Sequence, residues 1–102
     1  MSRVNLTDGS WFNPEIAERF AEDTRWNGTN RISIATGSQW DHEELYRTKT
    51  GRWILHAWSQ WQGTVPTYEE ISDSRARTWL LRNKEDAAVE RFFPGAIAAA
   101  EI

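Results

Sequence analysis

The chain of 102 residues contains no cysteine. Disulfide bonds and thiolate metal sites are therefore excluded, and the composition fits a reducing compartment. The sequence also has no uninterrupted apolar run long enough for a membrane-spanning helix. Its first residues lack the apolar segment of a signal peptide. These absences predict a cytoplasmic protein without a membrane segment.

Neither sign of charge dominates, because 12 Lys and Arg residues stand against 15 Asp and Glu, for a net charge of −3. Such mild acidity argues against general binding to nucleic acids. The glycines are isolated, so the sequence has no glycine-rich loop that could hold a phosphate. The length predicts a single domain over residues 1–102.

Tryptophan is abundant, with seven residues in total and three of them in the segment 53–61. A short chain buries a small share of its surface and needs large side chains in its core. Seven indoles nevertheless exceed what such a core holds easily. Because tryptophan is also enriched where proteins bind each other, we expect some of them to contact a partner.

The first half of the chain predicts a helix and a strand. Asn13 is a good N-cap and Pro14 suits the first helical position, which predicts a helix over 14–23. Alternating residues over 31–35 predict a strand. Two further strands, 44–49 and 52–59, flank Thr50-Gly51 as a hairpin. The sequence leaves two registers open, one pairing Thr48 with Trp53 and the other pairing Arg47 with Trp53.

The second half ends in helices. Residues 67–71 form either a fourth strand or the start of a helix. Ser72 is the better N-cap, since Ala76, Trp79 and Leu80 then share one helical face. A second helix follows from Glu85 to Phe93. The predicted fold class is α+β, an antiparallel sheet of three to four strands with one N-terminal and two C-terminal helices packed on it.

About half of the chain, residues 45–94, resembles short uncharacterised bacterial proteins of the kind found on plasmids and prophages. The similar residues are Leu45-Tyr46-Arg47-Thr48, Gly51-Arg52-Trp53, Trp58-Ser59-Gln60-Trp61-Gln62-Gly63, Glu70-Ile71-Ser72, Ala76, Trp79-Leu80-Leu81 and Asn83. The resemblance implies a mobile element as the setting and supplies no catalytic residues. Small phage proteins that block host defence are similar in size and acidity.

The two histidines suggest no complete chemical site. His42 and Glu44 have the spacing of metal ligands, but a metal site needs three or four ligands and no other histidine lies near in sequence. His56 lacks a nucleophile motif around Ser33 or Ser59. We therefore expect no catalytic residues, no metal, no cofactor and no enzymatic activity.

A protein-binding surface is the preferred functional hypothesis. Trp53 and Trp79 fit the core, whereas Trp58 and Trp61 are set among polar residues and fit a core or an interface equally well. The predicted contact residues are Trp58, Trp61, Gln60, Gln62 and Tyr68. Through them the chain would occupy a partner protein, inhibit a host defence system or associate with a second copy.

The alternative hypothesis is a small nucleic-acid-binding protein. Arg47, Lys49 and Arg52 cluster at the predicted hairpin tip beside Trp53, and Arg75 lies at the start of the predicted helix. Basic side chains among aromatic ones can bind a single strand by stacking and by phosphate contact. The negative net charge argues against this hypothesis.

Overall fold

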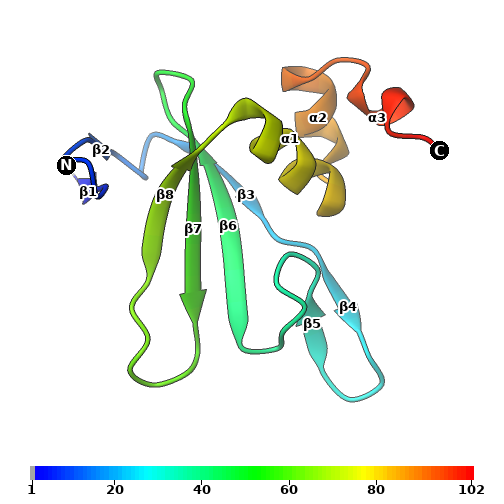
Figure 1. Cartoon of the computed structure of the whole chain (residues 1–102), viewed down its shortest axis with the longest axis horizontal. Helices are drawn as coiled ribbons and strands as arrows, with labels where there is room; N and C mark the ends of the chain where they lie inside the picture. Colours follow the sequence, from blue (N-terminus) through cyan, green and yellow to red (C-terminus); the bar gives the residue numbers. More distant parts are fainter. Residues whose placement is uncertain (1) are drawn as a thin grey trace.

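The computed structural model describes residues 2–102. Within them the chain forms eight strands and then three helices (Figure 1). In order these are β1 (Val4–Asn5), β2 (Trp11–Phe12), β3 (Glu18–Ala21), β4 (Thr24–Trp26), β5 (Arg31–Ser33), β6 (Asp41–Arg47), β7 (Trp53–Ser59), β8 (Thr67–Ile71), α1 (Asp73–Arg82), α2 (Asp86–Phe92) and α3 (Ala96–Ala99). The predicted α+β class with antiparallel strands is confirmed.

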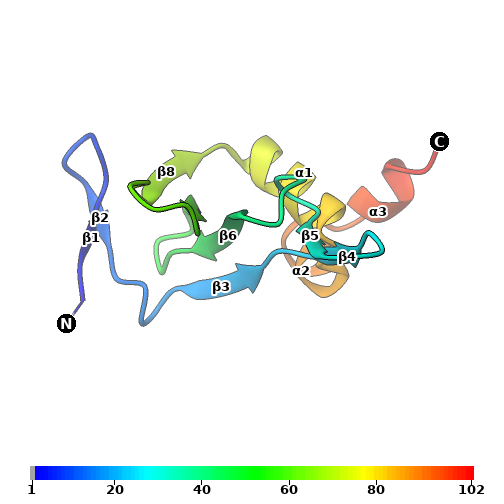
Figure 2. The ribbon, with the colours of Figure 1, turned by 90° about the horizontal axis from the view of Figure 1, so that it is seen from below.

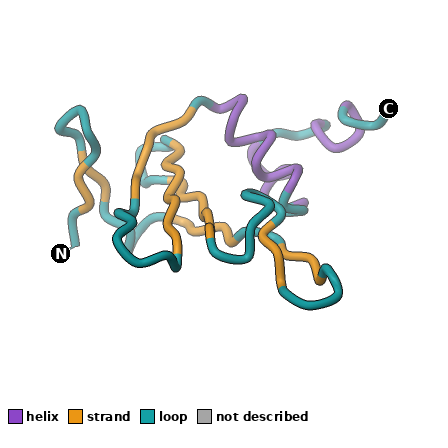
Figure 3. The backbone as a smooth tube through the Cα atoms, turned by 60° about the horizontal axis from the view of Figure 1, so that its bottom comes forward, coloured by secondary structure: helices purple, strands orange, loops and turns teal. Residues whose placement is uncertain are grey.

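The centre of the molecule is a four-stranded antiparallel sheet in the order β3-β6-β7-β8. Two small ribbons, β1-β2 and β4-β5, stand apart from it. The tube in Figure 3 shows the central sheet between β1-β2, which we call the N-terminal ribbon, and the helices. The strands are therefore divided among three sheets.

The register of the β6-β7 hairpin decides between the two alternatives left open by the sequence. Arg47 pairs with Trp53, and Leu45 pairs with Leu55. Two backbone hydrogen bonds close the turn. The Thr48 N–H donates to the Arg52 carbonyl at 2.9 Å, and the Gly51 N–H donates to the Thr48 carbonyl at 2.9 Å. Gly51 has a φ of +85°, which the last residue of such a three-residue loop requires.

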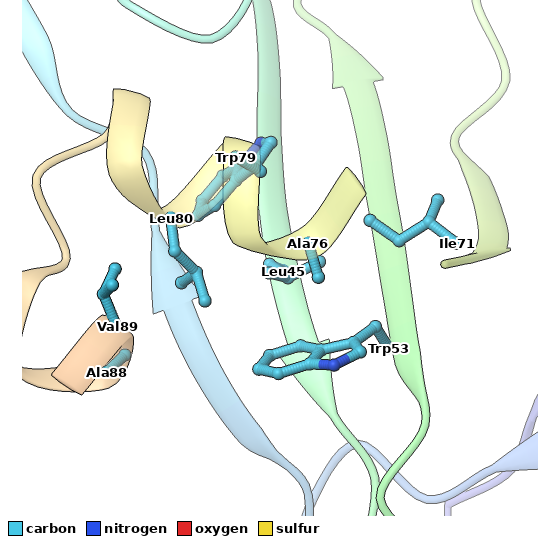
Figure 4. Close-up of a cluster of buried hydrophobic side chains, with 8 residues drawn as sticks. All are labelled: Leu45, Trp53, Ile71, Ala76, Trp79, Leu80, Ala88 and Val89. Carbon is cyan, nitrogen blue, oxygen red and sulfur yellow. The ribbon is translucent and has the colours of Figure 1, made fainter. Parts of the chain in front are cut away.

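The main core lies between one face of the sheet and the helices. Its buried side chains are Leu45, Trp53, Ile71, Ala76, Trp79, Leu80, Ala88 and Val89 (Figure 4). The indole of Trp53 is almost fully buried and contacts the rings of Phe92 and Phe93. The prediction that Trp53 and Trp79 belong to the core is confirmed.

The opposite face of the sheet is partly covered by the N-terminal ribbon. Phe12, from β2, packs with Tyr46 and Ile54 in a second buried cluster. Figure 2 shows this ribbon standing away from the sheet, at the far end from the helices. The part of this face beyond Phe12 carries the residues of the candidate site.

The helix predicted over 14–23 is wrong, since residues 18–21 form β3. Asn13 does cap a turn, because its side chain accepts the Glu15 N–H at 2.9 Å and its carbonyl accepts the Ala17 N–H at 3.2 Å. The turn ends there because β3 pairs with β6, and Phe20 packs against the rings of the main core. Pairing and burial thus outweigh the local helix signal.

The C-terminal helices begin where the sequence predicts. Ser72 caps α1 by accepting the Arg75 N–H at 3.2 Å, and residues 67–71 are the strand β8. Beyond α2, a third short helix follows Gly95, which has a left-handed conformation. Among residues 2–102, no helix has the length and apolar character needed to cross a membrane.

Candidate functional site

A column of four rings crosses the sheet on the face opposite the helices. Trp58 on β7 lies directly opposite His42 on β6, with ring centroids 5.6 Å apart. On the other side of Trp58 the ring of His56 stacks at 4.7 Å, and Tyr68 on β8 stacks on His56 at 4.2 Å. Because residues of one parity share a sheet face, the hairpin register builds this column.

Glu44 is the charged centre of this face and is buried. Its carboxylate accepts the Tyr46 hydroxyl at 2.8 Å, pairs with Nδ1 of His56 at 2.9 Å and accepts a hydrogen bond from Arg19 at 2.9 Å. A buried carboxylate needs several such partners to offset its loss of hydration. The three contacts link β3, β6 and β7 through one side chain.

Both tyrosines on this face hold their protons more tightly than a free tyrosine. Burial, with the hydrogen bond to Glu44 and its charge, raises the pKa of Tyr46 to about 12. Burial and the Glu44 charge also raise the pKa of Tyr68. The phenols therefore stay neutral over the physiological range, and Tyr46 remains a hydrogen-bond donor to Glu44.

A second carboxylate–histidine pair lies at the end of the column that His42 forms. Nδ1 of His42 lies 2.7 Å from the Glu22 carboxylate, which also accepts the Ser33 hydroxyl at 2.8 Å and the Glu43 N–H at 2.7 Å. Nε2 of His42 is buried and has no hydrogen-bond partner within the described residues. The pair fixes the ring of His42 against Trp58.

The two carboxylate–histidine pairs share one geometry. Each histidine directs Nδ1 to a carboxylate, a contact that fixes its ring orientation. Ser33 donates to Glu22 and makes no contact with a histidine in the hydrogen bonds of residues 2–102. Over the same residues, no group of three or more His, Asp or Glu side chains is placed to hold a metal ion.

Beyond the ring column, at the loop end of the sheet, two exposed tryptophans contact each other. The ring centroids of Trp40 and Trp61 lie 5.1 Å apart at an interplanar angle of 48°. Their residues are 40% and 59% exposed. We call these two residues the indole pair. Both rings keep apolar surface in water, and burial of that surface would gain free energy.

Hydrogen bonds fix the backbone on both sides of the indole pair. The Gln60 N–H donates to the Trp40 carbonyl at 2.9 Å, and this bond joins the two loops. The Trp40 N–H donates to the Ser38 hydroxyl at 2.9 Å, and the Thr64 hydroxyl donates to the Trp61 carbonyl at 2.8 Å. These bonds hold the backbone of the two loops that carry the indole pair.

The five predicted contact residues fall into two groups. Trp58 and Tyr68 are half-buried in the ring column, on either side of His56. Gln60, Trp61 and Gln62 are exposed in the loop after β7. The sequence interpretation missed Trp40, although the register that pairs Asp41 with Ser59 also carries Trp40 toward Gln60.

The predicted nucleic-acid residues do not share one face. The guanidinium of Arg47 lies over the rings of Trp53 and Phe92, on the helix side of the sheet. Arg52 forms a two-point contact with Glu70 on the opposite side, and Arg75 pairs with Glu69 at 2.9 Å. Lys49 is exposed and forms no ion pair within residues 2–102.

A cavity at the other end of the sheet was not foreseen from the sequence. It lies between the N-terminal ribbon and the turn that joins β6 to β7, and its volume is about 270 Å³. Trp11, Phe12 and Ile16 line one wall, and Lys49 and Ile54 line the other. No local motif marks it, since its walls come from segments far apart in the sequence.

Comparisons of the chain with protein-family models, with curated proteins and with solved structures found no match.

Proposed function

We propose that the chain is a non-enzymatic, cytoplasmic protein-binding module that occupies the surface of a partner protein through its indole pair. The observation that carries this proposal is the contact between the exposed indoles of Trp40 and Trp61, whose ring centroids lie 5.1 Å apart. Tryptophan is the residue most enriched among those that dominate binding energy at protein interfaces. Gln60 and Gln62 on either side of Trp61 supply hydrogen-bonding groups at the rim.

The fixed geometry of the pair supports this role. Binding costs free energy wherever flexible side chains and loops must be ordered. Here the bond from the Gln60 N–H to the Trp40 carbonyl orders the two loops in advance. A partner that covers both indoles would gain the burial of a large apolar area without that cost. Trp58 and Tyr68, already half-buried, then act as the support of this surface.

The carboxylate–histidine pairs support a non-catalytic role. Glu44 directs its oxygens to Tyr46, His56 and Arg19, and so it holds the sheet face together. A general base needs a free nitrogen within reach of a nucleophile. The setting on a mobile element rests on the resemblance of residues 45–94, and inhibition of a host defence system as the biological effect rests on similarity in size and acidity to small phage proteins.

The test is site-specific photo-crosslinking in a bacterial host, with a benzoyl-phenylalanine in place of Trp61. A matched control carries the same group in place of Trp26, which is 61% exposed, close to the 59% of Trp61, and lies on a different ribbon. We expect one defined protein adduct from position 61 and none from position 26. The adduct should disappear when Trp40→Ala removes the other half of the pair.

Two outcomes would overturn the proposal. One is a similar set of adducts from positions 61 and 26, which would indicate random encounters. The other is an adduct that persists undiminished in Trp40→Ala. An adduct of twice the chain mass would identify a second copy as the partner, and the mass of the isolated protein in solution would then show the same dimer.

The nucleic-acid alternative has weaker support. Arg52 and Arg75 are paired with Glu70 and Glu69, and Arg47 packs on aromatic rings. Phosphate contacts would have to replace these interactions. Titration with short single-stranded DNA and RNA at two salt concentrations tests it, since phosphate contacts are strongest at low salt. Binding at low salt that weakens in Arg52→Gln would favour the alternative.

A further inference from the structure

The cavity between the N-terminal ribbon and the β6-β7 turn has an apolar interior. Phe12 and Ile54, on its two walls, are buried in the second cluster. Ile16 and Trp11 line the walls, and Ile16 stays 57% exposed. A concave apolar site with a few polar groups at its mouth is the usual form of a small-molecule site. At about 270 Å³ it suits a small ligand.

Among the described residues, one cation at the mouth of the cavity has no carboxylate partner. Lys49 lines the cavity and forms no ion pair within residues 2–102. Arg52 also lines it, but its guanidinium is held by the two-point contact with Glu70. Hydroxyls of Thr48, Thr50 and Ser10 complete the rim. The carboxylates of Glu70 and of Asp8, which accepts the Ser10 hydroxyl, offset the charge of Arg52, so the mouth suits a single negative charge at Lys49 and not a polyphosphate.

We propose that this cavity binds a small monocarboxylate with an apolar body. The apolar body lies on Phe12, Ile54 and Ile16, and the carboxylate pairs with the ammonium group of Lys49. Because one wall belongs to the N-terminal ribbon and the other to the central hairpin, the ligand also holds the ribbon against the sheet. The cavity is lined by the β6-β7 turn, and Figure 1 shows this turn at the opposite end of the sheet from the loop after β7, which carries Trp61. The site is therefore separate from the proposed partner surface.

Octanoate is the probe, and the readout is the set of indole N–H signals in an NMR spectrum of the full chain. Seven tryptophans give seven such signals, and Trp11→Phe assigns the one at the cavity. We expect octanoate to shift the Trp11 signal in a saturable way and to leave that of Trp26 unchanged. Octan-1-ol, which lacks the charge, and AMP, which has a polar body and a dianionic phosphate, should bind more weakly.

Two variants test the two halves of the site. Lys49→Gln should weaken octanoate binding by roughly threefold to tenfold and leave octan-1-ol unaffected. Its matched control is Lys84→Gln, an exposed lysine away from the cavity. Ile16→Glu places a like charge beside the carboxylate and should abolish the shift, whereas Ile97→Glu on α3 should not. All four side chains are exposed, so the variants should fold, as far-ultraviolet circular dichroism will verify.

The proposal fails if octanoate shifts the exposed indoles of Trp26, Trp40 and Trp61 as strongly as that of Trp11. It also fails if Lys49→Gln and Lys84→Gln bind octanoate equally well, or if no signal moves at millimolar octanoate. Stronger binding of AMP than of octanoate would overturn the assigned ligand class.

Discussion

The imidazole of His56 lies parallel to the phenol of Tyr68, with the two ring centroids 4.2 Å apart and the planes 4° from parallel. The two residues are directly opposite each other on β7 and β8. Nδ1 of the same imidazole pairs with Glu44 on the neighbouring strand β6. His56 thus joins three strands, which makes its carboxylate partner the residue to test first.

Replacing Glu44 with alanine should lower the free energy of unfolding by about 2–4 kcal/mol, because the Tyr46 hydroxyl and His56 Nδ1 lose their buried acceptor. Urea denaturation measures the change. Glu15→Ala is the control, since Glu15 is exposed and its side chain contacts the Ser2 hydroxyl. Equal losses in both variants would contradict the central role of Glu44.

Replacing a tryptophan with alanine should lower stability more in the core than on the proposed contact surface. Trp53→Ala removes an almost fully buried indole and should cost roughly 3–5 kcal/mol of stability. Trp61→Ala removes an exposed ring and its contact with Trp40, and should cost about 1 kcal/mol or less. Thermal and urea unfolding of both variants check this. A loss of several kcal/mol in Trp61→Ala would assign Trp61 to the core and remove it from the proposed surface.

We expect Tyr46 to lose its proton at a higher pH than a free tyrosine does. Burial raises its pKa in the folded state to about 12, from an ordinary value of 10. The folded state therefore favours the neutral phenol, and the stability gained from this is fully present below pH 10 and lost as the pH rises through about 12.

A spectroscopic titration of tyrosinate resolves this, because the chain contains two tyrosines. Tyr46→Phe should remove the later of the two steps and leave that of Tyr68. A wild-type titration in which both tyrosines ionise near pH 10, while the protein is still folded, would contradict the buried contact with Glu44.

The three-residue turn should depend on glycine at position 51. Gly51 has a φ of +85°, and a Cβ there would lie 3.2 Å from a guanidinium nitrogen of Arg47. Gly51→Ala should therefore cost about 1–2 kcal/mol in urea denaturation. Gly51→Asn should cost less, because asparagine tolerates the left-handed region. Equal costs would mean that contact with Arg47, and not backbone conformation, sets the penalty.

Local signals in the sequence predicted the C-terminal half of the fold well. Ser72 as N-cap and Thr50-Gly51 as a turn depend on neighbouring residues alone, and the structure confirms both. The cap at Asn13 is also present, yet the chain leaves the helical path after one turn. What overrides it is the pairing of β3 with β6 and the burial of Phe20, which involve residues distant in sequence.

The sequence predicted only part of the candidate site, because contacts between residues distant in sequence complete it as well. Trp61 was identified because polar residues surround it in the sequence. Trp40, whose ring contacts that of Trp61, lies across the hairpin and 21 positions earlier in the sequence. The network around Glu44 required the register of β6 and β7, which the sequence left open. The cavity required the position of the N-terminal ribbon, which contacts the sheet through residues distant in sequence.

The order of the central sheet leaves β3 and β8 as its outer strands. Exposed strand edges can recruit further strands, and charged side chains on them oppose this. Here Glu18 and Arg19 lie on β3, and Glu69 and Glu70 lie on β8, each in an ion pair. We therefore expect the folded chain to resist edge-to-edge aggregation, so that concentrated solutions stay clear despite the exposed tryptophans.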